Sequence, residues 1–239
     1  MSSIFTKLGN ELKTLRRLWH HRLMVDTSTQ AKLVEEFTKL YCAYEEPVNS
    51  TWHQTTWLGH KILKCPLDLW IYQEMMFELK PDLIIETGTA HGGSALYLAG
   101  LCDLLGTGRV VSVDIESDPS RPKHPRIQYL LGSSVSEEIL RQVEEAARGC
   151  DSVLVILDSD HRQPHVIKEL RAYSRFVRKG GYLILEDTFV NGHPVGPDHG
   201  PGPMEALQQY LKETDEFVVD KSREKFYLTF NPSGYLKKK

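Results

Sequence analysis

The stretch Pro81–Ala99, PDLIIETGTAHGGSALYLA, decides the expected fold. It begins with the apolar run Leu83-Ile84-Ile85, passes an acid at Glu86 and reaches a glycine-bearing turn before an alanine- and leucine-rich segment of helical character. Glycines suit such a turn because a ligand can approach the backbone closely where no Cβ intervenes, and because the following helix offers free N–H groups. The order strand, glycine-rich turn, helix therefore predicts a site for a nucleotide-like ligand.

The spacing of the glycines separates two kinds of cofactor. Dinucleotide-binding turns carry G-x-G-x-x-G, whereas this turn reads Glu-x-Gly-x-x-x-Gly-Gly and has no glycine two residues after Gly88. It is similar to the first motif of S-adenosylmethionine-dependent methyltransferases. The alternative is a tight connection that binds nothing. On the methyltransferase interpretation, the cofactor contacts expected here are Glu86, Gly88, Thr89, Gly92 and Ser94.

Length and composition limit the class of protein. With 239 residues and 41% hydrophobic content, the chain suits one α/β domain, which we place at residues 46–239, behind an N-terminal helical extension at 1–45. The net charge of −3 gives no basic excess of the kind that indicates nucleic-acid binding. The four cysteines are far apart and form no C-x-x-C pair, so neither a zinc site nor a disulfide framework is indicated. A reducing cytoplasm fits this pattern.

The N-terminal 25 residues have an amphipathic pattern. Apolar residues recur at helical spacing, and five lysines and arginines outnumber the single acid Glu11. No apolar run reaches the roughly 18 residues of a membrane span, and the continuous apolar core of a signal peptide is missing. We expect this helix to pack on the domain or across the interface of a homo-oligomer. Peripheral attachment to a membrane surface is the alternative.

Strands and helices alternate along the rest of the chain. Apolar strands are expected at 83–85, 109–114, 126–131, 152–157 and 182–185, with helices at 30–44, 67–79, 136–147 and 164–177. This order predicts an α/β, Rossmann-like, doubly wound and mostly parallel sheet with helices on both faces. Segments 216–219 and 225–230 are expected to form a closing antiparallel pair. Ligands of such sheets bind beyond the carboxyl ends of the strands.

Polar residues at two of these strand ends are suited to a nucleoside. Asp114 ends the second strand, where a carboxylate accepts hydrogen bonds from both ribose hydroxyls; a turn cap is the alternative. Ser133 and Ser134 follow the third strand and are expected to contact the adenine ring. Trp52 and Trp57, near a polar loop, either line a pocket or anchor the N-terminal segment.

Acids follow two further strands. Asp158-Ser159-Asp160-His161 comes after one and Glu186-Asp187 after the next. Neighbouring carboxylates repel one another unless a cation or protons neutralise them, so the arrangement favours a bound divalent ion with oxygen ligands, which we expect to be Mg²⁺. Solvated acids at the rim of the sheet are the alternative. His161 is the expected proton acceptor, and His193 and His199, in a glycine- and proline-rich loop, are lesser candidates.

Several motifs together resemble one family. IIETGTAHGGSALYLA, VVSVD, LDSDH and ILEDT, followed by GPGPMEAL and FYLTFNPSGYL, are similar to the cephalosporin hydroxylase family, which includes rhamnosyl O-methyltransferases, over about residues 50–236. The resemblance implies a methyltransferase fold, S-adenosylmethionine and a divalent metal. By that similarity Asp158, Glu186 and Asp187 match the metal carboxylates, and Asp158 also belongs to the cofactor site. His161 stands where the more distant catechol O-methyltransferases place a catalytic lysine, and Glu-Asp replaces their Asp-Asn pair.

The function expected on these grounds is metal-dependent O-methyl transfer. The metal would chelate two neighbouring oxygens of the acceptor and lower the pKa of one, while His161 takes its proton. A vicinal diol of a sugar, such as rhamnose on a glycolipid or glycoside, suits that geometry, and a phenolic catechol is the near alternative. Two functions of different classes compete with methyl transfer: a nicotinamide oxidoreductase, and a non-catalytic partner protein that keeps the cofactor fold.

Overall fold

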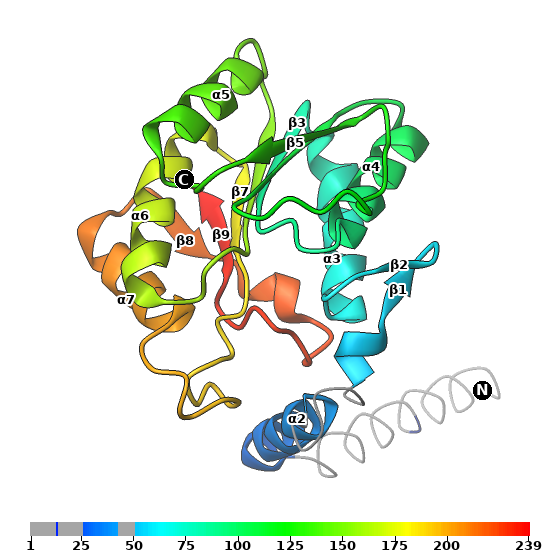
Figure 1. The fold of residues 1–239 in the computed structure, drawn as a ribbon. Coiled ribbons are helices and arrows are strands. Elements are labelled where there is room, and N and C mark those ends of the chain that lie inside the picture. The colour runs from blue at the N-terminus through cyan, green and yellow to red at the C-terminus, as the bar shows by residue number, and fades with distance from the viewer. Residues whose placement is uncertain (1–12, 14–25, 43–50) are drawn as a thin grey trace, which may run out of the picture.

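A computed structural model describes residues 13, 26–42 and 51–239 (Figure 1). The expected amphipathic helix of residues 1–25 lies outside this part except for Lys13. A seven-stranded sheet runs through the centre of the fold in the order β5-β4-β3-β6-β7-β9-β8. Among the described residues, no helix is long and apolar enough to cross a membrane.

The first five strands of the sheet, β3 to β7, are parallel to one another, as the sequence predicts. They are β3 (Leu83–Thr87), β4 (Val110–Asp114), β5 (Ile127–Leu131), β6 (Val153–Leu157) and β7 (Tyr182–Leu185). The side chains of β3, β6 and β7 are buried throughout, which explains why these strands read as continuous apolar runs.

Helices cover both faces of the sheet. One apolar core joins the sheet to α5 (Glu137–Ala147), α6 (Gln163–Tyr173) and α7 (Pro203–Glu213). A second core joins the other face to α3 (Pro66–Leu79) and α4 (Gly93–Leu105). The expected helix 164–177 is shorter than predicted, because α6 ends at Tyr173 and η2 (Ser174–Phe176) follows.

The antiparallel pair exists, but the prediction located one of its strands wrongly. β8 (Phe217–Val219) pairs with β9 (Tyr235–Lys238), which also pairs with β7. Residues 225–230, expected as the second strand, contain no strand. Their alternating apolar residues pack elsewhere: Phe230 stacks on Phe189 with ring centroids 4.5 Å apart. The Phe230 N–H donates to buried Asp68 at 2.8 Å, which replaces a ladder hydrogen bond.

Smaller elements precede the sheet. Helix α2 (Thr27–Tyr41) begins three residues earlier than expected, because Asp26 accepts hydrogen bonds from Ser28 N and Thr29 N. A short 3-10 turn, η1 (Thr51–Gln54), and the hairpin of β1 (Thr56–Trp57) and β2 (His60–Lys61) lead into α3. A further turn, η3 (Lys221–Glu224), follows β8.

Candidate functional site

A pocket of about 490 Å³ opens where β3, β4, β5, β6 and β7 end. Its walls combine the glycine-rich turn with the segments that follow the other strands. This is the location expected for ligands of a doubly wound sheet. The pocket is lined by Trp52, Leu63, Gly88, Ala90, Val113, Asp114, Ile115, Gly132, Ser133, Ser134, Asp158, Ser159, Asp160, His161, His165 and Asp187.

The glycines of the turn meet other parts of the chain. Gly88 has a φ of +87°, and a Cβ built on it would lie 1.8 Å from the carbonyl oxygen of Asp158. A Cβ on Gly93 would lie 2.1 Å from the carbonyl oxygen of Lys61. Gly88 also lines the pocket, so the missing side chain both lets the turn pack against Asp158 and leaves the backbone open to a ligand. Gly92, expected as a cofactor contact, caps the start of α4 and does not line the pocket.

Asp114 lies at the end of β4 and lines the pocket, as predicted. Its Oδ2 accepts hydrogen bonds from Thr89 N at 3.0 Å and Ala90 N at 2.8 Å, and it lies 3.1 Å from the Arg121 guanidinium. Its Oδ1 accepts from Glu116 N at 2.9 Å. The carboxylate therefore holds the glycine-rich turn as well as facing the pocket.

Glu86 lies beneath the pocket and does not line it. It is fully buried, and its Oε2 accepts from Ser112 Oγ at 2.7 Å. Ser112 Oγ lies 2.7 Å from Thr89 Oγ1, so Glu86 supports the turn through a chain of hydroxyls. Burial raises the pKa of Glu86 above its ordinary value. Ser94 and Thr89 line a small adjoining pocket of about 20 Å³.

Ser133 and Ser134 follow β5 and line the pocket; their contact with an adenine ring stays a prediction. The structure adds His165, whose Nε2 lies 3.0 Å from Ser134 Oγ and 3.6 Å from Oε1 of buried Glu169. The nearby carboxylate of Glu169 raises the pKa of His165 above its ordinary value. Ser159 Oγ also donates to Glu169 Oε1, at 2.8 Å. The i, i+4 spacing of His165 and Glu169 is the one signal for this pair in the sequence.

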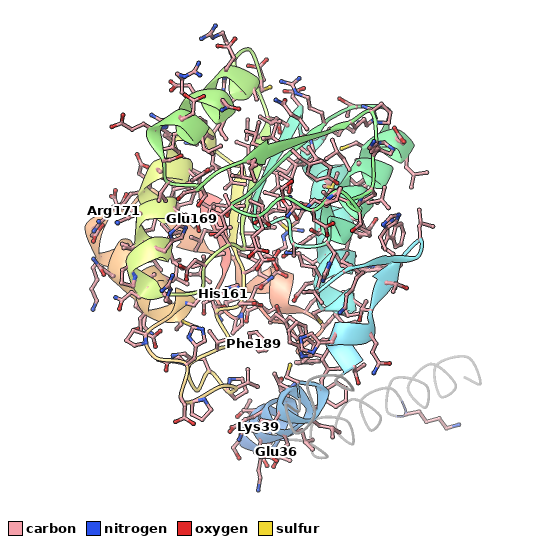
Figure 2. All side chains as sticks on the ribbon, in the orientation of Figure 1. Glu36, Lys39, His161, Glu169, Arg171 and Phe189 are labelled. Carbon is pink, nitrogen blue, oxygen red and sulfur yellow. The ribbon has the colours of Figure 1, made fainter. Side chains whose placement is uncertain are left out.

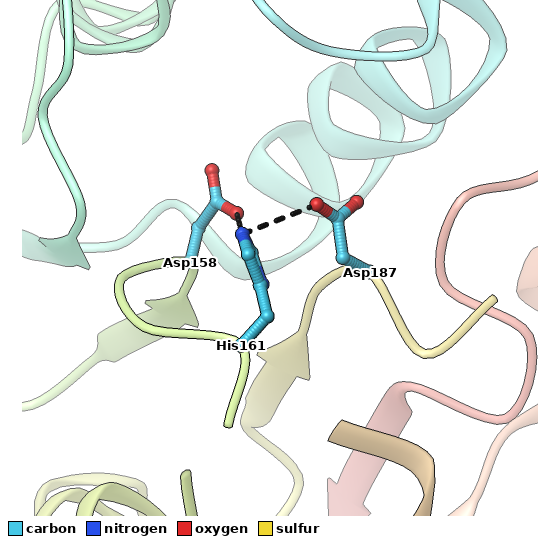
Figure 3. Close-up of side chains that lie close together, drawn as sticks. All are labelled: Asp158, His161 and Asp187. Atoms are coloured by element: carbon cyan, nitrogen blue, oxygen red, sulfur yellow. Dashed lines mark ion pairs between the residues drawn. The ribbon is translucent and has the colours of Figure 1, made fainter. Parts of the chain in front are cut away.

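Three titratable side chains meet at the other end of the pocket. The Nε2 atom of His161 lies 3.4 Å from Asp187 Oδ2 and 3.9 Å from Asp158 Oδ1 (Figure 3). Ligand atoms of the three residues all lie within 4.8 Å of one another. Burial raises the pKa of Asp187 to about 6, an effect that the charge of His161 opposes. Figure 2 shows His161 and Phe189 on the side of the molecule where α2 lies.

Glu186 points away from this group. Asp187 has a φ of +54°, so the chain turns sharply here, and the side chains of Glu186 and Asp187 point in different directions. Glu186 Oε1 accepts from Lys64 Nζ at 2.6 Å and from Tyr72 OH at 2.9 Å. Lys64 also donates to Asp158 Oδ2, at 2.5 Å. Burial and the charge of Asp158 raise the pKa of Glu186 well above its ordinary value, and the Lys64 ammonium opposes them.

Lys64 is a site residue that the sequence patterns did not identify. It is 3% exposed and lies between β2 and α3, far along the chain from both of its acidic partners. Burial alone would lower the pKa of the Lys64 ammonium, but the charges of Asp158 and Glu186 outweigh burial and raise the pKa. The local signal is weak: a lysine flanked by apolar residues in KILKCPL.

Other candidates lie at the edge of the site or outside it. Asp160 lines the pocket but pairs with Arg162 at 2.5 Å. His193 lies 2.9 Å from Glu205 and does not line the pocket, and His199 is exposed and also outside it. Of the two tryptophans, Trp52 lines the pocket, whereas Trp57 packs edge-on against Tyr97 with centroids 4.9 Å apart.

Comparison with known proteins gives consistent matches. The family model of rhamnosyl O-methyltransferase/CmcI matches residues 49–239. The rhamnosyl O-methyltransferase of Mycobacterium leprae (strain TN) is 37% identical over 214 residues, which cover 87% of this chain and 91% of that protein. A solved apo structure of CmcI superimposes with a TM-score of 0.59 at 24% identity, covering 79% of this chain and 78% of that chain. A CmcI structure with Mg and SAM gives 0.59 at 23% identity, covering 80% and 78%.

Proposed function

The chain belongs to the rhamnosyl O-methyltransferase/CmcI family, and on this premise we propose that it is a metal-dependent O-methyltransferase of a sugar diol. S-adenosylmethionine is the methyl donor of this proposal. The observation that carries it is the meeting of Asp158, His161 and Asp187 in the same pocket that Asp114 lines. One end of the pocket suits a nucleoside, and the other suits a reacting oxygen.

The nucleoside half of the proposal rests on Asp114 and the two serines. Asp114 is available to the ribose hydroxyls from the pocket wall, while its backbone contacts fix its position. Ser133 and Ser134 lie after the adjacent strand β5, where the adenine ring would reach. His165 extends this end of the pocket and presents a ring nitrogen beside Ser134.

The carboxylate end has the donors that a hard divalent cation requires. Asp158 and Asp187 offer carboxylate oxygens, which Mg²⁺ prefers, and His161 offers a nitrogen within the same 4.8 Å. Asp187 is half-buried, and the loss of solvent around its carboxylate raises its pKa, so a cation beside it would stabilise the charged form. We propose that Asp158 and Asp187 hold the ion, and that Glu186, which binds Lys64 and Tyr72, adds its negative charge to the site without being a ligand of the ion. When bound, the ion would lower the pKa of an acceptor hydroxyl.

The chain's own residues position the reactants and move one proton. The acceptor oxygen forms a bond to the methyl carbon as the bond from that carbon to sulfur breaks, leaving S-adenosylhomocysteine. The hydroxyl proton passes to Nε2 of His161, which Asp187 stabilises as the imidazolium. Holding donor and acceptor in line supplies a large part of the rate acceleration.

A vicinal diol of a sugar is the acceptor we propose. Two adjacent oxygens suit the facing carboxylates of Asp158 and Asp187, and Trp52 in the pocket wall offers an aromatic surface for the apolar face of a sugar ring. The name of the M. leprae relative describes a rhamnosyl acceptor for that protein. A catechol would present the same pair of oxygens and is the competing acceptor.

The test measures methyl transfer and cofactor binding together. Calorimetric titration should show S-adenosylmethionine and S-adenosylhomocysteine binding and no comparable binding of NAD. Methyl transfer to a rhamnosyl glycoside should stop in excess chelator and return with Mg²⁺, and catechol should be a poorer acceptor at equal concentration. Full activity in a folded, metal-free enzyme would refute the metal. Binding of the cofactor without methylation of any diol would favour a non-catalytic partner protein.

A further inference from the structure

A buried lysine stands among the acids of the site. Lys64 is 3% exposed, and its Nζ lies 2.5 Å from Asp158 Oδ2 and 2.6 Å from Glu186 Oε1. These contacts join a segment before α3 to the ends of β6 and β7. A lysine is rarely buried to this extent unless it is paired. Lys64 therefore contributes a positive charge at a fixed position in the site.

Lys64 offsets part of the negative charge of Asp158, Glu186 and Asp187. Asp158, Glu186 and Asp187 carry a formal −3 when ionised, and the ammonium of Lys64 contributes +1, which leaves −2. A divalent cation balances this remainder. Without Lys64 the group of Asp158, Glu186 and Asp187 would carry one more uncompensated negative charge, which is costly for a buried carboxylate such as Glu186.

The contacts of Lys64 also determine which oxygen of Asp158 faces the pocket. Lys64 binds Oδ2, whereas Oδ1 is the atom that lies toward His161. Glu186 is held in the same way by Lys64 and by the hydroxyl of Tyr72. One ammonium group thus orients two carboxylates that come from different strands.

From these contacts we infer that Lys64 is a positioning residue, which acts as the internal counter-ion of the carboxylate cluster and turns Asp158 Oδ1 toward the site of the divalent cation. The part that concerns the cation rests on the proposed function. The part that concerns the counter-ion does not, because it is measurable on the protein without metal, cofactor or acceptor.

The experiment compares melting temperatures of wild type, Lys64→Met, the double variant Lys64→Met/Glu186→Gln and Lys212→Met, each in chelator and in Mg²⁺. Lys212 is an exposed lysine on α7 and controls for the substitution itself. In chelator, Lys64→Met should melt about 10 °C below wild type, because buried Glu186 and half-buried Asp158 lose the cation between them. The double variant should regain at least half of the loss without metal, and Mg²⁺ should raise the Tm of Lys64→Met at least twice as far as that of wild type.

Two results would overturn the inference. A loss that neither Mg²⁺ nor Glu186→Gln repairs would mean that Lys64 only fills space, and an unchanged Tm in chelator would mean that it is no counter-ion. If Lys64→Met does not fold, the double variant decides, since the inference requires it to fold. If calorimetry detects no Mg²⁺ binding to wild type, the proposed metal fails, while the comparison in chelator still reports the role of Lys64.

Discussion

Gly88 and Asp158 approach each other so closely that a Cβ on Gly88 would stand 1.8 Å from the carbonyl oxygen of Asp158. Gly88 also has a φ of +87°, a conformation that L side chains rarely adopt. Strands β3 and β6 can therefore end side by side only because residue 88 has no side chain. This close approach brings the glycine-rich turn next to the carboxylate cluster.

Replacing Gly88 with alanine tests how much stability is lost to the steric clash, beyond the loss caused by the left-handed backbone alone. Gly88→Ala should lower the free energy of unfolding by at least about 3 kcal/mol, because the clash adds to the roughly 1–2 kcal/mol of the left-handed backbone. Gly180→Ala is the matched control, since Gly180 has a φ of +81° and, within the described part of the chain, no atom within 4 Å of the added Cβ. Urea unfolding of both variants measures the difference. Equal losses would show that the strand ends move apart easily.

Asp114 should contribute to cofactor affinity. Asp114→Ala should weaken S-adenosylmethionine binding by about 2–3 kcal/mol, because charge-assisted hydrogen bonds to the ribose and the support of Thr89 and Ala90 are lost together. Calorimetric titration measures this, with Asp118→Ala as the control, an acid in the next loop that does not line the pocket. An unchanged affinity in folded Asp114→Ala would remove this residue from the cofactor site.

His161 should matter for rate more than for binding. His161→Ala should reduce the rate of methyl transfer by about 10²–10⁴-fold if the ring is the general base. Affinities for S-adenosylmethionine and Mg²⁺ should change little, which single-turnover kinetics and calorimetry would resolve. His199→Ala is the control, because His199 is exposed and outside the pocket. Loss of Mg²⁺ affinity in His161→Ala would instead identify His161 as a ligand of the ion.

His165 should make stability depend on pH. Its pKa is raised in the folded protein, chiefly by the nearby carboxylate of Glu169. The charged ring therefore stabilises the fold fully below the unfolded pKa of about 6.5, and this contribution is lost as the pH rises through the folded value. The Tm difference between wild type and His165→Gln should accordingly shrink between pH 5.5 and 8. A difference that stays constant would show that folding leaves the pKa of His165 unchanged.

The role of residues 1–25 remains a prediction, either binding to a membrane surface or packing on the domain or a second copy. If their basic, apolar pattern binds anionic membrane, deleting them should abolish pelleting with anionic liposomes and leave turnover of a soluble acceptor intact. A changed oligomeric state in gel filtration, with liposome binding absent from wild type, would favour packing against the domain or a second copy.

Features that depend on hydrophobic periodicity and on the positions of strand ends could be predicted from the sequence. The five parallel strands, Asp114 and the meeting of Asp158 with Asp187 follow from apolar runs and from the rule that such ends share an edge. Lys64 could not be found in this way, because its partners lie 94 and 122 residues along the chain and no local pattern links them. The misplaced strand has a similar cause: buried Asp68 binds the backbone of Phe230, and that contact joins residues 162 apart.

One edge of the sheet is only three residues long. β8 (Phe217–Val219) is the outermost strand beyond β9, and the acids Glu216 and Asp220 flank it. A sheet edge offers unpaired N–H and C=O groups to other chains, and short, charged edges limit this. β8 is therefore a poor template for edge-to-edge aggregation. We therefore do not expect two copies of this chain to join their sheets across β8.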